Sequence, residues 1–99
     1  MNQLRIHATA VAKSALRHTP AGVAVLELNF RHEGTVAEAG MARALAFEFG
    51  AVAVGVVAQA LDRESLGASM LLEGFIAPRT RRTMRLIMHI TEYKIAEGN

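Results

Sequence analysis

A two-residue alternation of apolar and polar side chains is the feature that most restricts how this chain can fold. In "LRIHATA", leucine, isoleucine and alanine alternate with Arg5, His7 and Thr9, and "VAVLELNFR" repeats the pattern. Successive side chains of a strand point to opposite faces of a sheet, so this period is typical of half-buried strands. We therefore predict strands at Gln3–Ala12 and Val23–Arg31.

The middle of the chain is ambiguous between strand and helix. "HEGTVAEAG", residues 32–40, is polar and glycine-bounded, which predicts a long, mobile hairpin loop. The alanine-rich segment that follows favours a helix by propensity, but its larger side chains alternate, and Gly50 and Gly55 would each cost a helix about 1 kcal/mol. We predict a strand at Met41–Val54 and then a short helix at Val56–Glu64.

The last third of the chain reads as two more strands. "ASMLLEGFIA" is an apolar run with an internal glycine, so we predict a bent strand that ends at Pro78. A final strand at Met84–Ile95 loses its alternation near Thr91, which indicates a bulge. Five strands with a short helix between the third and the fourth are typical of the OB-fold, an all-β, partly open Greek-key barrel.

Length and composition bear on the number of domains, the cellular location and membrane association. A chain of 99 residues has room for one hydrophobic core, so we expect a single domain over residues 1–99. It has no cysteine and no basic leader before an apolar block, which favours a cytoplasmic location. Its longest uncharged window, Phe49–Leu61, is shorter than the roughly 20 apolar residues of a membrane span, so we expect no membrane partner.

Positive charge is concentrated near the C-terminus. Residues 1–78 hold six Lys/Arg and seven Asp/Glu, a net −1, whereas residues 79–99 hold five and two, a net +3. The cluster is either a solvated hairpin tip that protects a sheet edge or a site for a polyanion, whose binding releases counter-ions. The loop between the fourth and fifth strands of an OB-fold belongs to its oligonucleotide-binding surface, so we favour nucleic acid. The arginines are Arg79, Arg81, Arg82 and Arg85.

Aromatic side chains are few in this sequence. Phe30 and Phe75 have the parity of core residues, whereas Phe47 or Phe49 could stack a base, pack in the core or meet a second subunit. Both parities of the third strand are largely apolar, more than one small barrel can cover, which favours a homodimer. We expect a binder driven by electrostatics and tolerant of base sequence.

Nothing in the sequence predicts an enzyme. The four histidines are dispersed and cysteine is absent, so no metal site is expected. Glu33 and Glu38 fall in the predicted loop, which cannot fix two carboxylates for acid–base chemistry. No phosphate-cradling glycine loop or nucleophile turn occurs, and we expect no cofactor.

The chain resembles the PriB family of bacterial primosomal replication proteins, which are OB-fold relatives of single-stranded DNA-binding proteins. The resemblance is carried by "NQLRIHATAVAKSALRHTPAGVAVLELNFRHE", "EAG", "VAVG", "LLEGFIA" and "LIMHITEYKI", in that order along nearly the whole chain. It implies a homodimer without catalytic activity that binds single-stranded DNA and helps the PriA helicase, with other primosome proteins, to restart replication forks.

The resemblance also implies particular DNA contacts. They are the four arginines already named and Arg43 on the third strand, with Lys13 and Arg17 in the loop between the first two strands as further candidates. Ala46 stands beside Phe47 where the family carries a tryptophan, and arginine replaces lysine in a slightly shorter loop. Arginine favours bidentate phosphate contacts and stacking on bases. The rival interpretations are an OB-fold module that grips an acidic protein and one that binds RNA.

Overall fold

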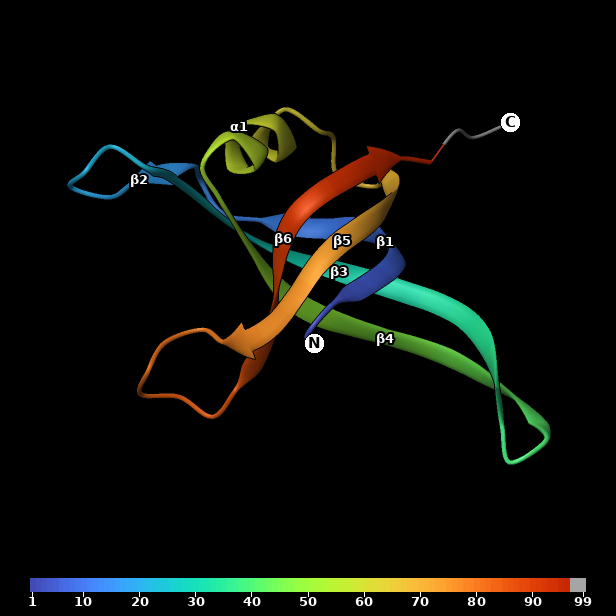
Figure 1. Cartoon of the computed structure of the whole chain (residues 1–99). Coiled ribbons are helices and arrows are strands. Elements are labelled where there is room, and N and C mark those ends of the chain that lie inside the picture. Colours follow the sequence, from blue (N-terminus) through green and yellow to red (C-terminus); the bar gives the residue numbers. More distant parts are fainter. Residues whose placement is uncertain (97–99) are drawn as a thin grey trace.

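Five strands of the protein close into a barrel. The computed structural model describes residues 1–96, in which neighbouring strands follow the order β1-β5-β6-β4-β3 and a β1–β3 pairing closes the ring (Figure 1). The predicted five-stranded OB-fold, with its helix between the third and fourth barrel strands, is confirmed. In chain order the elements are β1 (Leu4–Lys13), β2 (Arg17–His18), β3 (Ala24–Glu38), β4 (Met41–Val54), α1 (Val56–Asp62), β5 (Ser69–Pro78) and β6 (Leu86–Ile95).

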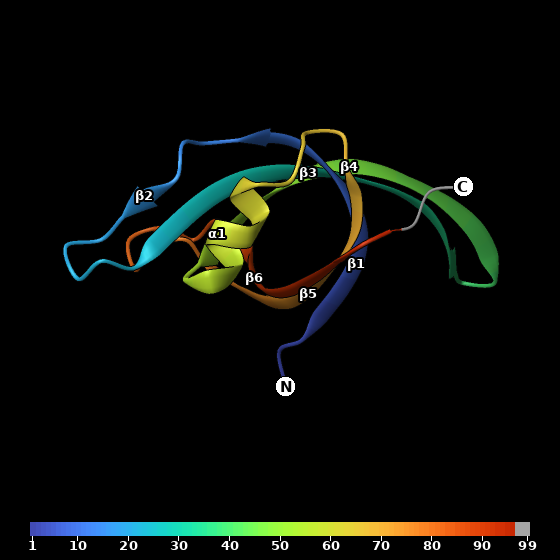
Figure 2. The ribbon, with the colours of Figure 1, turned by 90° about the horizontal axis from the view of Figure 1, so that it is seen from above.

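The core lies inside the barrel and beneath α1, which covers one of its ends (Figure 2). The alternation predicted this inner face, because Leu26, Leu28 and Phe30 are buried while Asn29 between them is exposed. Ala58 and Leu61 bring the buried side of α1 onto the same cluster. The outer faces of the strands are therefore left free for binding.

A bulge bends the β5–β6 pair where the sequence predicted one. Glu73 pairs with Glu92 and Gly74 with Ile90, which leaves Thr91 as the extra residue. A Cβ atom on Gly74 would lie 1.8 Å from the carbonyl oxygen of His89. Only glycine fits this close approach of two backbones, so the internal glycine of "LLEGFIA" is explained by the curl of the barrel.

The predicted loop at residues 32–40 is wrong. β3 continues to Glu38 and stays paired with β4 as far as Glu38 opposite Met41. A two-residue turn, Ala39 and Gly40, joins the strands. Their φ values of 53° and 77° both lie in the left-handed region, as the two central residues of a type I′ turn require. The hairpin projects from the barrel (Figure 1), so both of its faces are open to solvent. A strand in this position can be polar on both faces, which is why its sequence resembles that of a loop.

The remaining boundaries differ little from the predicted ones. β4 has the predicted bounds, α1 ends at Asp62, and β6 begins at Leu86 after the arginine segment. The two-residue strand β2, which pairs with the start of β3, was not predicted. Within residues 1–96, no helix has the length and apolar character that crossing a membrane requires.

Candidate nucleic-acid interface

The arginine loop, residues 79–85, joins β5 to β6 and is held by its own threonines. The backbone N–H of Arg82 donates to the Thr80 hydroxyl at 3.3 Å, and the N–H of Arg85 donates to that of Thr83 at 3.0 Å. The loop projects from the barrel (Figure 1). All four of its arginines are exposed.

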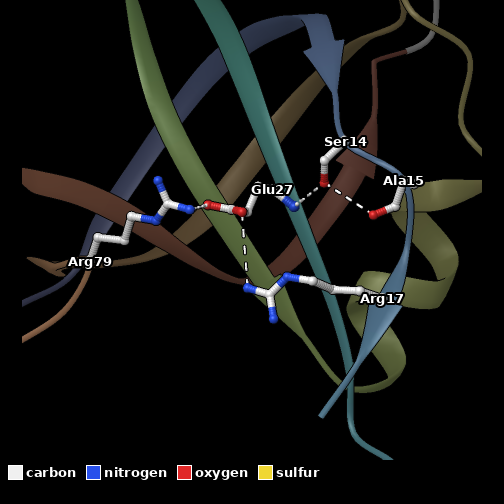
Figure 3. Close-up of polar contacts among 5 residues, drawn as sticks. All are labelled: Ser14, Ala15, Arg17, Glu27 and Arg79. Atoms are coloured by element: carbon white, nitrogen blue, oxygen red, sulfur yellow. Dashed lines mark hydrogen bonds and ion pairs between the residues drawn. The ribbon is translucent and has the colours of Figure 1, made fainter.

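A single carboxylate connects this loop to the opposite side of the site. Glu27 on β3 forms an ion pair with Arg79, and the guanidinium of Arg17 lies 3.9 Å from the same carboxylate (Figure 3). The N–H of Glu27 also donates to the Ser14 hydroxyl at 3.2 Å. Glu27 therefore joins the β5–β6 loop to the connection between β1 and β3.

The other three arginines of the loop keep their charge uncompensated. Arg81, Arg82 and Arg85 form no ion pair with any acid among residues 1–96. Like charges held this close are relieved by an anion, and a guanidinium presents a planar fork of donors that matches a phosphate. The loop is thus a cationic rim with only Arg79 engaged by an acid.

A groove of about 530 Å³ lies beside this rim. Gly50 forms part of the floor of this groove and has no side chain to fill it. A Cβ atom there would lie 3.4 Å from Ile87 Cγ2 and 3.8 Å from Asn29 Oδ1. Asn29 and Gly50 are cross-strand partners and belong to the outer face of the sheet. The groove is lined by Ala12, Lys13, Ser14, Glu27, Leu28, Asn29, Gly50, Ala51, Arg79, Arg85, Leu86 and Ile87.

Lys13 lines the groove but directs its ammonium group elsewhere. Its Nζ donates to the backbone carbonyls of Asp62 at 2.5 Å and Glu64 at 2.9 Å. These carbonyls are at the C-terminal end of α1, where a helix carries partial negative charge. The structure therefore gives Lys13 a role in holding the helix on the barrel.

Arg43 is the predicted residue that the structure places apart from the others. It lies near the tip of the β3–β4 hairpin and pairs with Glu38 at 2.5 Å. This tip and the β5–β6 loop extend from opposite sides of the barrel in both views (Figures 1 and 2). Arg43 and the arginine loop thus form two separate cationic positions.

Phe47 lies on the opposite face of the sheet from the groove. It shares the parity of Phe49 and the buried Ala51, whereas Gly50 is on the other parity. The residue is 41% exposed, and its ring packs against those of His32 at 5.3 Å and Phe49 at 6.0 Å between centroids. The contacts favour packing or a subunit interface over base stacking for this ring.

The core assignment of Phe75 is wrong, and sequence reasoning missed a candidate site residue there. Phe75 is 37% exposed and stacks on His89, with centroids 4.8 Å apart and ring planes 9° from parallel. The sequence did contain a sign of this exposure, because Phe75 lies two residues from the charged Glu73 and so shares its face of the strand. The apolar residues around both positions made the whole segment read as core. Buried Met70 and Leu72 take the other parity, so Phe75 points outward.

The comparisons with known proteins agree with this geometry. A model described as "another single-strand binding protein family" matches residues 2–92. The Replication restart protein PriB of Bordetella pertussis is 36% identical over 99 residues, covering 100% of this chain and 92% of that protein. That of Nitrosomonas europaea is 33% identical over 94 residues, covering 95% and 87%. The chain belongs to the PriB family.

Solved structures extend the PriB comparison to three dimensions. PriB of Ralstonia solanacearum superposes with a TM-score of 0.89 at 32% identity, covering 98% of this chain and 99% of that one. A single-stranded DNA-binding protein of Thermus aquaticus gives a TM-score of 0.78 at 23% identity, over 99% of this chain and 51% of that one. The second likeness, at this low identity, shows the fold alone.

Proposed function

We propose that this PriB-family protein binds single-stranded DNA as a non-enzymatic accessory protein of replication restart. The observation that carries the proposal is the cationic rim, in which three arginines without an acidic partner among residues 1–96 stand beside an open groove. The names of the relatives, which are replication restart proteins at 33–36% identity, supply the biological setting.

The groove suggests how the strand is held. Arg81, Arg82 and Arg85 take phosphates and release the strand's counter-ions. Arg79 joins them by exchanging the Glu27 carboxylate for a phosphate, since both are oxygen acceptors for the same guanidinium fork. Glycine at the floor lets the strand lie close to the sheet. Such contacts position the backbone and read no sequence, so binding is tolerant of base sequence.

A homodimer belongs to the proposal, and the edge of β1 supports it. β1 pairs with β5 from Leu4 to Thr9 but pairs with β3 only from Thr9 to Lys13. Residues 4–8 therefore have an open edge on the β3 side, where His32 Nδ1 reaches the carbonyl of His7 at 2.6 Å. An unpaired edge of this kind is a template for a strand of a second copy. The exposed Phe47 and Met41 of the hairpin add apolar area for that contact.

The proposed partners are single-stranded DNA, a second copy of this chain, the PriA helicase and other primosome proteins. The DNA-bound dimer stimulates the helicase. The proposed location is the cytoplasm. No metal or cofactor enters the proposal. Within residues 1–96, no group of three or more His, Cys, Asp or Glu side chains is arranged to hold a metal ion.

A salt titration tests the proposed function. Binding of labelled single-stranded DNA is measured by anisotropy over a series of salt concentrations, for the natural protein and for Arg81→Ala and Arg82→Ala. We expect the slope of log K against log salt to fall by about 0.7 for each phosphate that a substitution leaves without its arginine. Lys94→Ala, with the same charge change far along β6 from the loop, is the control.

Three outcomes would contradict the proposal. DNA binding that survives removal of all four loop arginines would show that the rim is not the site. Stronger binding of an RNA oligomer of equal length would favour the RNA interpretation, which the 2′-hydroxyl distinguishes. Absence of nucleic-acid binding by the natural protein would leave an acidic protein as the partner of the rim.

A further inference from the structure

We propose that Phe75, backed by His89, is a platform on which one unpaired base stacks. The inference rests on the proposed function, because it names a base contact within the same DNA interface. Phe75 on β5 and His89 on β6 are direct cross-strand partners, and their rings are nearly parallel at 4.8 Å. Phe75 is 37% exposed, so part of its side chain is open to extend this stack by one more ring.

The platform lies on the same outer face as the groove. Ile87, which lines the groove, is the partner of Ala77, and the Phe75–His89 pair follows two residues further along both strands. Because strand side chains alternate, a step of two residues stays on one face and advances about 7 Å. A strand that leaves the groove over Ile87 therefore meets Phe75 next.

The charges on the two sides of the platform differ. On the groove side are the uncompensated arginines of the loop. On the other side, Glu73 and Glu92 form the next outward cross-strand pair, and Arg5 engages Glu73 at 2.8 Å. Arg5 compensates the charge of Glu73, whereas Glu92 forms no ion pair among residues 1–96, so this side attracts a phosphodiester less than the arginines do. The base on Phe75 is thus the last one before the backbone meets the acidic pair.

His89 contributes a flat surface rather than a polar contact. Its Nε2 is buried and has no hydrogen-bond partner in the described part of the chain. The ring sits between Phe75 and the β4 strand, where Val52 is its parallel neighbour. An imidazole fixed in this way supports the Phe75 ring from behind. Aromatic faces hold any of the four bases, which suits a sequence-tolerant binder.

A tryptophan at this position would report the stack directly. The chain has no tryptophan, so Phe75→Trp introduces a single indole. We expect its fluorescence to be quenched by a thymidine oligomer, with affinity at or above that of the natural protein. An abasic oligomer of the same length should bind through its phosphates without quenching. Equal quenching by both oligomers would overturn the platform.

A ring deletion provides the second measurement. Phe75→Leu keeps an apolar side chain and should weaken binding of the thymidine oligomer by about five- to tenfold, the lower part of the range for removal of one stack. The weakening should be the same at every salt concentration, because stacking releases no counter-ions. Val56→Ala removes exposed apolar area from α1, outside the groove, and is the comparison.

The possible failures are distinguishable. Undiminished binding by Phe75→Leu, while loop-arginine variants bind weakly, would overturn the platform and leave the proposed function standing. An equal reduction in Val56→Ala would also overturn it, since the effect would then not depend on the Phe75 ring. If sedimentation shows that Phe75→Leu dissociates a dimer with DNA affinity unchanged, a second copy rather than a base covers the ring. Absence of DNA binding by the natural protein would instead contradict the proposed function.

Discussion

Glu27 on β3 holds the guanidinium of Arg79 across the groove, where under the proposed function a phosphate of the bound strand would replace the carboxylate (Figure 3). The carboxylate is partly exposed and also lies 3.9 Å from Arg17. Exchange for a phosphate therefore requires no rearrangement of the barrel. In the absence of nucleic acid, this contact keeps two cationic side chains in place and lowers the positive potential of the groove.

Removal of the Glu27 charge should strengthen DNA binding. Glu27→Gln frees Arg79 and Arg17, and an exposed ion pair is worth about 0–1 kcal/mol, so we expect affinity to rise roughly two- to fivefold at low salt. Anisotropy titration measures the change. Glu33→Gln removes the same charge from an acid that pairs with Arg31 outside the groove, and it is the matched control. Weaker binding by Glu27→Gln would mean that the carboxylate positions the arginines.

Loss of the Lys13 ammonium should affect stability more than DNA binding. Lys13→Met keeps the apolar stem but removes the two hydrogen bonds to the Asp62 and Glu64 carbonyls. We expect the free energy of unfolding to fall by about 1–2 kcal/mol in urea titrations. Lys94→Met, which changes the same charge on an exposed strand position, should have little effect. A large decrease in DNA affinity with unchanged stability would instead place Lys13 in the binding site.

Substitution of Gly74 should be severely destabilising. In Gly74→Ala, the new Cβ meets the backbone oxygen of His89, which cannot move away without breaking the bulge. We expect a loss above about 3 kcal/mol, or failure to fold, by thermal melting followed with circular dichroism. In Gly34→Ala the Cβ meets only the His32 side chain, so a much smaller effect is expected. Equal stability of the two variants would contradict the close β5–β6 approach.

Tyr93 should make stability fall at high pH. Burial, a hydrogen bond to Glu64 at 2.7 Å and the charge of that carboxylate raise the pKa of the Tyr93 phenol to about 12. The unfolded chain loses this proton near pH 10, so the stabilisation is complete below pH 10 and disappears as pH rises toward 12. Absorbance titration follows the chain's single tyrosine. Tyr93→Phe should lack this component, and a phenol that titrates near pH 10 in the folded protein would contradict the contact.

The local patterns of the chain predicted most of its elements. β4 was predicted with its observed bounds, and the bulge at Thr91 was visible as a break in the alternation. Both follow from the two-residue alternation of a strand, which can be read from residues adjacent in the sequence. The continuation of β3 to Glu38 was missed because polarity marks exposure, and an exposed strand paired with β4 is as polar as the hairpin loop predicted there.

The sequence by itself determined that the chain forms a small barrel and that a cluster of four arginines interrupts its last two strands. Only the tertiary structure decided which charges meet. Closure of the barrel brings Glu27 to Arg79, and the register of β5 with β6 places Phe75 beside His89 on the groove face. The physical reason is that alternation is a property of one strand, whereas ion pairs and stacks across a barrel depend on strand order and register. These follow from packing of the whole core.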